Sequence, residues 1–190
     1  SIRLNPFKSS QIEGSKIPWT QYGKYLKERP SFTLDPNFHA GAYYVQEASS
    51  MLLEQALIQS TDLSKPLRVL DLSAAPGGKS THIISLLNSD SLLISNEVIR
   101  SRATILSENK KKWGYPNVVI TCNDPKDFNN LEGFFDVIVV DAPCSGEGLF
   151  RKDPDAMNEW SADHVQLCSM RQRRILSDVC PSLKENGILI

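Results

Sequence analysis

The sequence predicts an α/β fold, built on a mostly parallel sheet with helices on both faces. Short apolar runs alternate with segments of helical periodicity over residues 67–190, a pattern typical of parallel sheets. Two of these runs, residues 67–72 and 137–140, end in loops of unusual composition. Because open α/β sheets bind ligands at the carboxyl ends of their strands, we expect a functional site where these loops meet.

The composition is that of one ordinary globular domain, with 190 residues, 41% hydrophobic and 23% charged. No stretch approaches the roughly 18 apolar residues of a membrane span, and the chain does not open with a basic and then apolar leader, so we expect a cytoplasmic protein. The formal net charge of -1 supplies no general field for a polyanion. A nucleic-acid partner would therefore need a local basic surface.

The four cysteines have spacings that match neither a zinc site nor a short disulfide framework, so we expect no metal centre. Free cysteine is among the most buried residue types, and Cys122, Cys168 and Cys180 are expected in the core. Cys144 differs because proline, serine and glycine surround it rather than aliphatic side chains.

Two regions are expected along the chain. Residues 1–44 hold four prolines and no long periodic apolar segment, so they are expected to form an irregular lead-in. Residues 45–190 are expected to form the domain, which begins with an amphipathic helix over residues 46–58. The elements expected after it are strands over residues 67–72, 92–95, 118–121, 135–140 and 188–190, and helices over residues 79–87, 100–113 and 163–183.

Glycine punctuates the ends of the second and third of these later helices, at Gly114 and Gly187, where a left-handed residue is common. The sequence stops at Ile190, three apolar residues into the last expected strand. A domain rarely stops on such an unpaired edge. We therefore expect a fragment whose sheet is truncated after the fifth strand.

The loop after residues 67–72 reads Ser-Ala-Ala-Pro-Gly-Gly-Lys-Ser and opens a helix. Gly77 and Gly78 allow a ligand to approach the backbone, and the free amides at the helix start favour a carboxylate or phosphate. Glu97 follows the second strand, where an acid can accept hydrogen bonds from both hydroxyls of a ribose. Together they imply a ligand that contains an adenosine.

Two alternatives compete for this loop. Gly78, Lys79 and Ser80 also match the end of a phosphate-binding P-loop, with residues 137–141 as its acidic, magnesium-binding strand. That motif needs glycine at position 73, where serine stands, and Pro76 removes an amide from a cradle that works through backbone amides. The nucleotide triphosphatase is thus the weaker hypothesis, and the plain structural alternative is a tight turn without a ligand.

The second loop, Asp-Ala-Pro-Cys-Ser-Gly at residues 141–146, places a carboxylate and a thiol at a strand end. Carbon 5 of a pyrimidine is a poor nucleophile until a group adds at carbon 6, and a thiolate can add there and later leave. Cys144 therefore favours methylation of a ring carbon over methylation of an amine. Asp141 is expected to hydrogen-bond an exocyclic amino group or the methyl donor.

Four segments, residues 38–51, 71–80, 135–148 and 151–154, together resemble the Sun-type RNA cytosine-5 methyltransferases, and most closely the group of bacterial small-subunit ribosomal RNA methyltransferases. The resemblance implies a Rossmann-like class I methyltransferase sheet, S-adenosylmethionine as cofactor and RNA, most simply ribosomal RNA, as partner. It also implies that residues 1–44 are the tail of an N-terminal RNA-binding region. It implies no obligate protein partner.

By the same resemblance, Glu97 holds the ribose, Asp124 lies by the adenine, and Lys79 faces the active site and hydrogen-bonds the cytosine. Lys79, Asp141 and Cys144 are thus the candidate catalytic residues. Arg151 and Lys152 follow the thiol loop and are expected to contact RNA phosphates. The full set expected around the cofactor is Asp71, Ser73, Ala74, Ala75, Pro76, Gly77, Gly78, Lys79, Glu97, Asp124 and Asp141.

The family uses two cysteines, and the attacking one lies in a Thr-Cys motif on the strand that here begins at residues 187–190. That residue is expected just beyond Ile190, and Cys144 then corresponds to the thiol that assists release of the methylated base. The chain alone is therefore expected to bind the donor without transferring a methyl group. Transfer RNA as the substrate, and a donor-binding fragment without catalysis, remain the alternatives.

Overall fold

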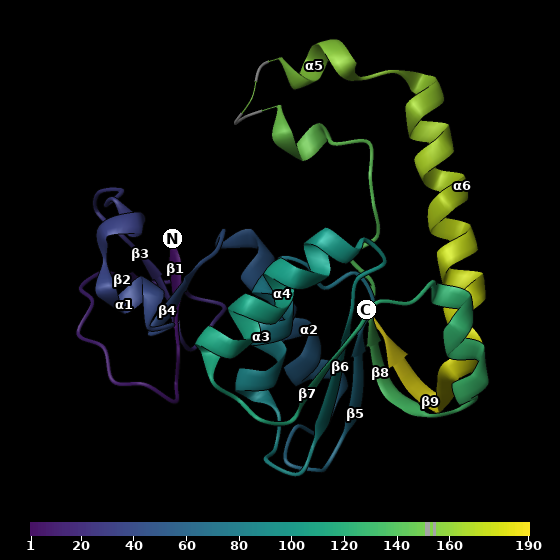
Figure 1. The fold of residues 1–190 in the computed structure, drawn as a ribbon, viewed down its shortest axis with the longest axis horizontal. Helices are drawn as coiled ribbons and strands as arrows, with labels where there is room; N and C mark the ends of the chain where they lie inside the picture. Colours follow the sequence, from purple (N-terminus) through teal and green to yellow (C-terminus); the bar gives the residue numbers. More distant parts are fainter. Residues whose placement is uncertain (151–152, 154) are drawn as a thin grey trace.

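The computed structural model describes residues 1–150, 153 and 155–190 and contains two sheets (Figure 1). The larger is a five-stranded sheet of order β7-β6-β5-β8-β9, in which all neighbouring strands are parallel. This confirms the predicted α/β class with a parallel sheet. Its strands are β5 (Arg68–Asp71), β6 (Leu92–Asn96), β7 (Val118–Thr121), β8 (Phe135–Val139) and β9 (Leu183–Leu189).

Helices cover both faces of this sheet. Successive side chains of a strand point to opposite faces, and here both sets are apolar and pack against helices. Val69, Leu93 and Val137 belong to the cluster that includes residues of α2 (Leu53–Ser60), α3 (Gly78–Leu86) and α4 (Arg100–Trp113). The next residues along, Leu70, Ile94 and Ile138, belong to the opposite cluster, with residues of the 3-10 helix η3 (Pro125–Leu131) and of α6 (Ala162–Val179). Burial on both faces explains why these strands read as continuous apolar runs.

In the region of the larger sheet, the predicted end of the last helix was wrong. The segment expected to be helical over residues 163–183 ends as an α-helix at Val179, passes through the 3-10 turn η5 (Cys180–Ser182) and enters β9 at Leu183. Pro181 explains the difference, because proline has no N–H group to donate and its ring obstructs an α-helix. The last strand is accordingly longer than the expected residues 188–190.

The N-terminal region is not the irregular lead-in that the sequence led us to expect. It forms an antiparallel sheet of order β2-β3-β1-β4, and a short helix α1 (Pro36–His39) follows the 3-10 turn η1 (Phe32–Leu34). Its strands are β1 (Ile2–Leu4), β2 (Ser15–Lys16), β3 (Gly23–Tyr25) and β4 (Tyr43–Val45). Strands of two or three residues are too short to show a period of two, which is the signal that sequence reasoning uses.

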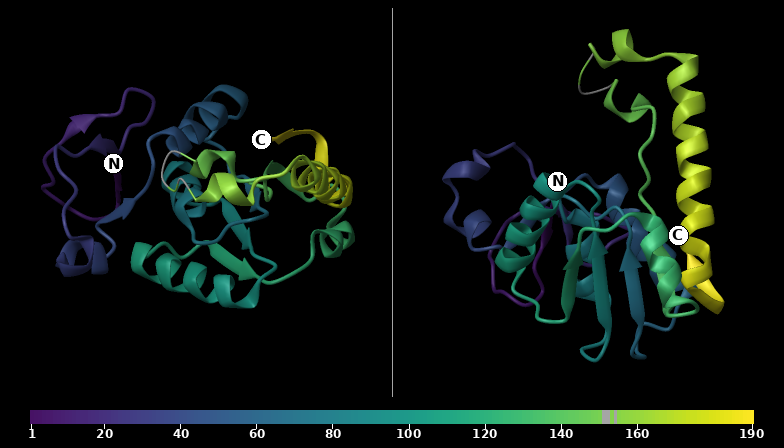
Figure 2. Two further views of the ribbon diagram at one scale, coloured as in Figure 1. Left: turned by 90° about the horizontal axis from the view of Figure 1, so that it is seen from above. Right: turned by 45° about the vertical axis from the view of Figure 1, so that its right-hand side comes forward.

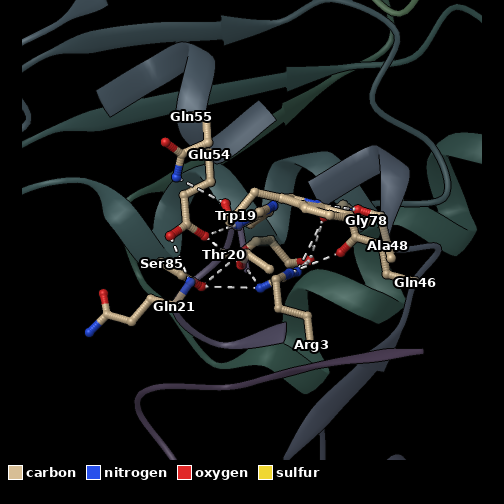
Figure 3. A network of polar contacts seen from close by, with 12 residues as sticks. Arg3, Trp19, Thr20, Gln21, Gln46, Ala48, Glu54, Gln55, Gly78 and Ser85 are labelled. Carbon is tan, nitrogen blue, oxygen red and sulfur yellow. Dashed lines mark hydrogen bonds and ion pairs between the residues drawn. The ribbon is translucent and has the colours of Figure 1, made fainter. Parts of the chain in front are cut away.

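The two sheets lie side by side (Figure 1). Polar side chains link the N-terminal region to the helices of the larger sheet. The expected helix over residues 46–58 begins as the 3-10 turn η2 (Ser49–Leu52) and continues as α2. Buried Glu54 of α2 accepts hydrogen bonds from Thr20 Oγ1 at 2.6 Å and from the backbone N–H of Gln21 at 2.8 Å (Figure 3). Its carboxylate also lies 2.8 Å from Nε2 of buried His82 of α3.

Between β8 and α6 the chain leaves the body of the domain through η4 (Glu147–Leu149) and α5 (Ala156–Glu159). In Figure 1 and in the right-hand view of Figure 2, the first half of α6 stands clear of the sheet. No helix among the described residues is long and apolar enough to cross a membrane.

The cysteines divide differently from the prediction. Cys168 is buried as expected, whereas Cys122 and Cys180 are exposed. Cys122 directly follows β7, an edge strand of the larger sheet, and Cys180 follows the end of α6. Both therefore lie at the periphery of the core.

Candidate active site

The two unusual loops begin next to each other, as predicted. β5 and β8 are parallel neighbours in which Asp71 pairs with Val139, so the loop that starts at Leu72 and the loop that starts at Val140 leave the same edge of the sheet. The carboxyl end of β6, with Glu97, joins this edge because β6 pairs with β5 on the other side. This is the position where open α/β sheets bind ligands.

Residues 73–79 are called the donor loop here because they are expected to bind the methyl donor, and α4 supports them from one side. Asn109 Nδ2 donates to the carbonyl oxygen of Pro76 at 2.8 Å, and Arg102 Nη2 donates to that of Ala75 at 3.0 Å. Gly77 has a φ of 112°, and a Cβ there would lie 3.2 Å from Leu106 Cδ1. The positive φ thus favours glycine at position 77, and the space beside Leu106 of α4 is tight.

Asp71 is the most perturbed carboxylate of this edge. It is completely buried, and its Oδ2 accepts a hydrogen bond of 2.6 Å from Ser80 Oγ. Burial raises the pKa of Asp71 to about 6, although the Ser80 hydroxyl and the Lys79 charge act in the opposite direction. Its other oxygen, Oδ1, has no hydrogen-bond partner among the described residues. A buried acceptor without a partner indicates a missing group.

Glu97 supplies a second acceptor of this kind. Its side chain is 2% exposed, and Oε1 accepts a hydrogen bond of 3.0 Å from the backbone N–H of Ile99. Oε2 lies 3.3 Å from Arg102 Nη1 but receives no hydrogen bond from the described residues. Asp71 and Glu97 therefore each present, from the ends of neighbouring strands, one carboxylate oxygen that accepts no hydrogen bond from the described residues and could accept one from a ligand hydroxyl or amino group.

Lys79 and Asp141 join the two loops. Lys79 lies in the first turn of α3, and its Nζ forms an ion pair with Asp141 Oδ2. Asp141 is more than half exposed and Lys79 about a quarter, so both remain open to a substrate. They border a groove of about 300 Å³, whose other lining residues are Ser49, Ser50, Leu52, Leu53, Ala56, Val139, Val140 and Ile190. This volume is at the lower end of the range for small-molecule pockets.

Cys144 lies exposed in the loop that follows Asp141. Gln172 Nε2 of α6 donates to the carbonyl oxygen of Pro143 at 3.0 Å, and Glu147 accepts hydrogen bonds from Ser145 Oγ and Trp160 Nε1. The projecting segment and α6 thus support the thiol loop. Sequence reasoning missed Gln172, Arg102 and Asn109, because none belongs to a motif.

Asp124 caps η3 next to the end of β7, on the same edge of the sheet. Arg174 Nη2 of α6 donates to both of its carboxylate oxygens, at 3.1 and 3.2 Å. The candidate RNA residues Arg151 and Lys152 lie outside the described residues.

Comparisons with known proteins identify the family of the chain. The family model for the 16S rRNA methyltransferase RsmB/F matches residues 59–190, and the model for the N-terminal domain of 16S rRNA methyltransferase RsmF matches residues 1–48. A ribosomal RNA small subunit methyltransferase F of Escherichia coli O157:H7 is 36% identical over 206 residues, covering 100% of this chain and 43% of the relative. The chain therefore spans less than half the length of this curated relative.

Solved structures agree with the sequence matches. A methyltransferase homolog protein from Pyrococcus horikoshii has a TM-score of 0.81 at 30% identity, over 99% of this chain and 62% of that one. NSun6 from Pyrococcus horikoshii, solved with SFG, has a TM-score of 0.73 at 29% identity, over 85% of this chain and 40% of that one. The fold is thus the Rossmann-like methyltransferase sheet. The chain belongs to the RsmB/F family of 16S rRNA methyltransferases, and S-adenosylmethionine is its cofactor.

Proposed function

We propose that this chain forms the donor-binding core of an enzyme that transfers a methyl group from S-adenosylmethionine to carbon 5 of a cytosine in small-subunit ribosomal RNA. The observation that carries the proposal is one sheet edge that combines an ion pair, an exposed thiol and two buried carboxylates, each with one oxygen that accepts no hydrogen bond from the described residues. This combination suits a ribose-containing donor and a pyrimidine acceptor.

The bound donor supplies an electrophilic methyl group on a sulfonium. Glu97 accepts hydrogen bonds from the ribose hydroxyls, and the free amides at the start of α3 bind the donor carboxylate. Asp71 Oδ2 holds Ser80, and thereby the first turn of α3, in place. Asp71 Oδ1 accepts a hydrogen bond from the methyl donor. Asp124 completes the pocket near the adenine.

On the cytosine, Asp141 accepts a hydrogen bond from the exocyclic amino group, and Lys79 donates to a ring acceptor. The attacking thiolate is a second cysteine, which the family pattern assigns to the position after residues 187–190. Its sulfur forms a bond to carbon 6, and carbon 5 then takes the methyl group as the methyl–sulfonium bond breaks and leaves a neutral thioether. A base accepts the carbon 5 proton, the carbon 5–carbon 6 double bond re-forms, and the carbon 6–sulfur bond breaks to release the thiolate. Cys144 assists this last elimination, which frees the enzyme from the base.

Ribosomal RNA is favoured over transfer RNA by one observation, the match of residues 1–48 to the N-terminal domain of a 16S rRNA methyltransferase. Arg151 and Lys152 remain candidates for phosphate contacts, which would make RNA affinity fall with salt. A substrate of this kind also places the enzyme in the cytoplasm.

Donor binding is tested first, by calorimetric titration of S-adenosylmethionine into the chain. We expect saturable binding that Glu97→Ala abolishes, that Glu132→Ala at an exposed site leaves unchanged, and that ATP with magnesium does not displace. Binding of ATP in place of the donor would overturn the proposal in favour of a nucleotide triphosphatase.

The role of Cys144 is tested in the full-length protein with small-subunit RNA. If this thiol assists release, Cys144→Ala accumulates an RNA–protein adduct that resists denaturation, whereas Cys180→Ala turns over like the parent. Loss of methyl transfer without an adduct would assign Cys144 an earlier role. Methyl transfer by residues 1–190 alone would contradict the expectation that this segment is inactive.

A further inference from the structure

Arg3 of β1 is buried completely, although it carries a charge. Its guanidinium lies 4.5 Å from the ring centroid of Trp113. In Figure 3 it lies between Gln46, Gly78 and Ser85. Its hydrogen bonds go to Thr81 Oγ1 at 2.6 Å, Gln46 Oε1 at 2.9 Å, the carbonyl oxygens of Gly78 and Thr81 at 3.2 Å, and Ser85 Oγ at 3.4 Å.

This burial is costly for the folded state. Desolvation lowers the pKa of Arg3 to about 9, and no carboxylate forms an ion pair with it among the described residues. The effective penalty for burying an ion is several kcal/mol, and replacing a buried ionic group with apolar residues is often neutral or stabilising. A role in stability alone therefore does not explain a guanidinium at this position.

The acceptors of Arg3 indicate where it acts. Gly78 and Thr81 lie in the first turn of α3, where the donor loop ends and the helix begins. The Gly78 carbonyl belongs to the same peptide group as the N–H of Lys79. A charged donor on that carbonyl polarises the peptide and makes the N–H on its other side a stronger donor. Arg3 therefore acts on the end of α3 that is proposed to bind the donor carboxylate.

Asn5, two residues along, makes an instructive contrast. It is also buried, and its Nδ2 donates to the carbonyl oxygens of Gly41 at 2.8 Å and of Trp113 at 2.9 Å, at the far end of α4. Both side chains thus fasten the N-terminal sheet to the larger domain. Of these two side chains, Arg3 hydrogen-bonds to α3 and Asn5 does not.

We propose that Arg3 is a positioning residue for donor binding, which holds and polarises the first turn of α3 and makes donor affinity depend on the docked N-terminal sheet. The inference rests on the proposed donor site. Because binding linkage is reciprocal, the donor in turn stabilises the docked position of β1. The N-terminal sheet then influences donor affinity through the first turn of α3, without contacting the donor.

The test compares Arg3→Met and Arg3→Lys with Asn5→Ala, which removes a hydrogen bond to α4 but leaves Arg3 and its contacts with α3 in place, so that β1 stays docked. S-adenosylmethionine affinity is measured by calorimetry at a temperature where thermal unfolding shows every variant folded. We expect Arg3→Met to lose about tenfold or more in affinity, Arg3→Lys to lose less, and Asn5→Ala to bind like the parent. Equal affinities for Arg3→Met and Asn5→Ala would overturn the inference.

A second measurement needs no variant. Hydrogen exchange of the parent with and without S-adenosylmethionine should show added protection of the β1 amides, and unchanged exchange there would also overturn the inference. The proposed function fails separately, if the parent does not bind the donor or if Glu97→Ala binds it as well as the parent. If Arg3→Met does not fold, Arg3→Lys and the exchange measurement decide.

Discussion

Asp71 and Ser80 are joined by a hydrogen bond of 2.6 Å that closes the donor loop at its base. Asp71 is the last residue of β5, and Ser80 lies in the first turn of α3. The bond therefore fixes the start of the helix against the strand. The other Asp71 oxygen stays without a partner among the described residues, so the molecule retains a buried charge that its own fold does not satisfy.

Replacement of Asp71 by asparagine should stabilise the protein in a pH-dependent way. The pKa of Asp71 is raised from 3.8 to about 6 in the folded state. The protonated carboxyl group of Asp71 therefore contributes to the free energy of unfolding fully below pH 3.8, and this contribution is lost as the pH rises through about 6. Asp71→Asn should gain about 2–3 kcal/mol over the parent at pH 7 and little at pH 4. Thermal unfolding from pH 4 to 8 measures this, and a gain that is the same at every pH contradicts it.

The Lys79–Asp141 ion pair should matter little for stability. Both side chains are partly exposed, and such pairs contribute about 0–1 kcal/mol. Lys79→Met should therefore change the free energy of unfolding by no more than this, while methyl transfer by the full-length enzyme falls by orders of magnitude. Lys65→Met, in the exposed pair with Asp62, is the control and should alter neither. A large loss of stability in Lys79→Met would assign Lys79 a structural role.

Gly41 should be among the positions least tolerant of alanine. Its φ is +67°, and a Cβ would lie 2.1 Å from the carbonyl oxygen of Lys112. Gly133 has a similar φ of +58° but nothing within 4 Å. Gly133→Ala should thus cost only the left-handed penalty of about 1–2 kcal/mol, and Gly41→Ala clearly more. Urea unfolding of both variants tests the difference, and equal costs would show that the backbone near Lys112 yields easily.

The cysteines should react in an order set by exposure. Cys122, Cys144 and Cys180 are exposed, whereas Cys168 is 5% exposed. An alkylating reagent should label the first three in the native protein and Cys168 only after denaturation, as read by peptide mass spectrometry. Rapid native labelling of Cys168 would mean that α6 opens readily.

Much of the sheet was predictable because its strands are buried on both faces and its helices carry clear stop signals such as Gly114. The meeting of the two loops was predictable because the carboxyl ends of parallel strands lie on the same side of a sheet. The N-terminal strands were not predictable, since two or three residues carry no period. The end of α6 was a missed proline signal at Pro181.

The site was predictable only where a motif marked it. Residues 73–80 and 141–146 stand out by composition, whereas the supports of these loops do not. Arg102 and Arg174 look like residues of a solvated helix face, and their contacts with Glu97 and Asp124 appear only once the elements are packed. Arg3 belongs to no motif, and nothing in its local sequence indicates burial.

Helix α4 links two parts of the molecule that sequence distance separates. Its side chains support the donor loop through Arg102 and Asn109, while its last carbonyl groups receive Asn5 and Lys8 of the N-terminal region. A helix of this length spans about 21 Å and connects the two sets of contacts as one rigid element. A chimaera that exchanges the N-terminal region between relatives should therefore carry the last turn of α4 with it, so that the carbonyl groups of that turn stay matched to the donors at positions 5 and 8.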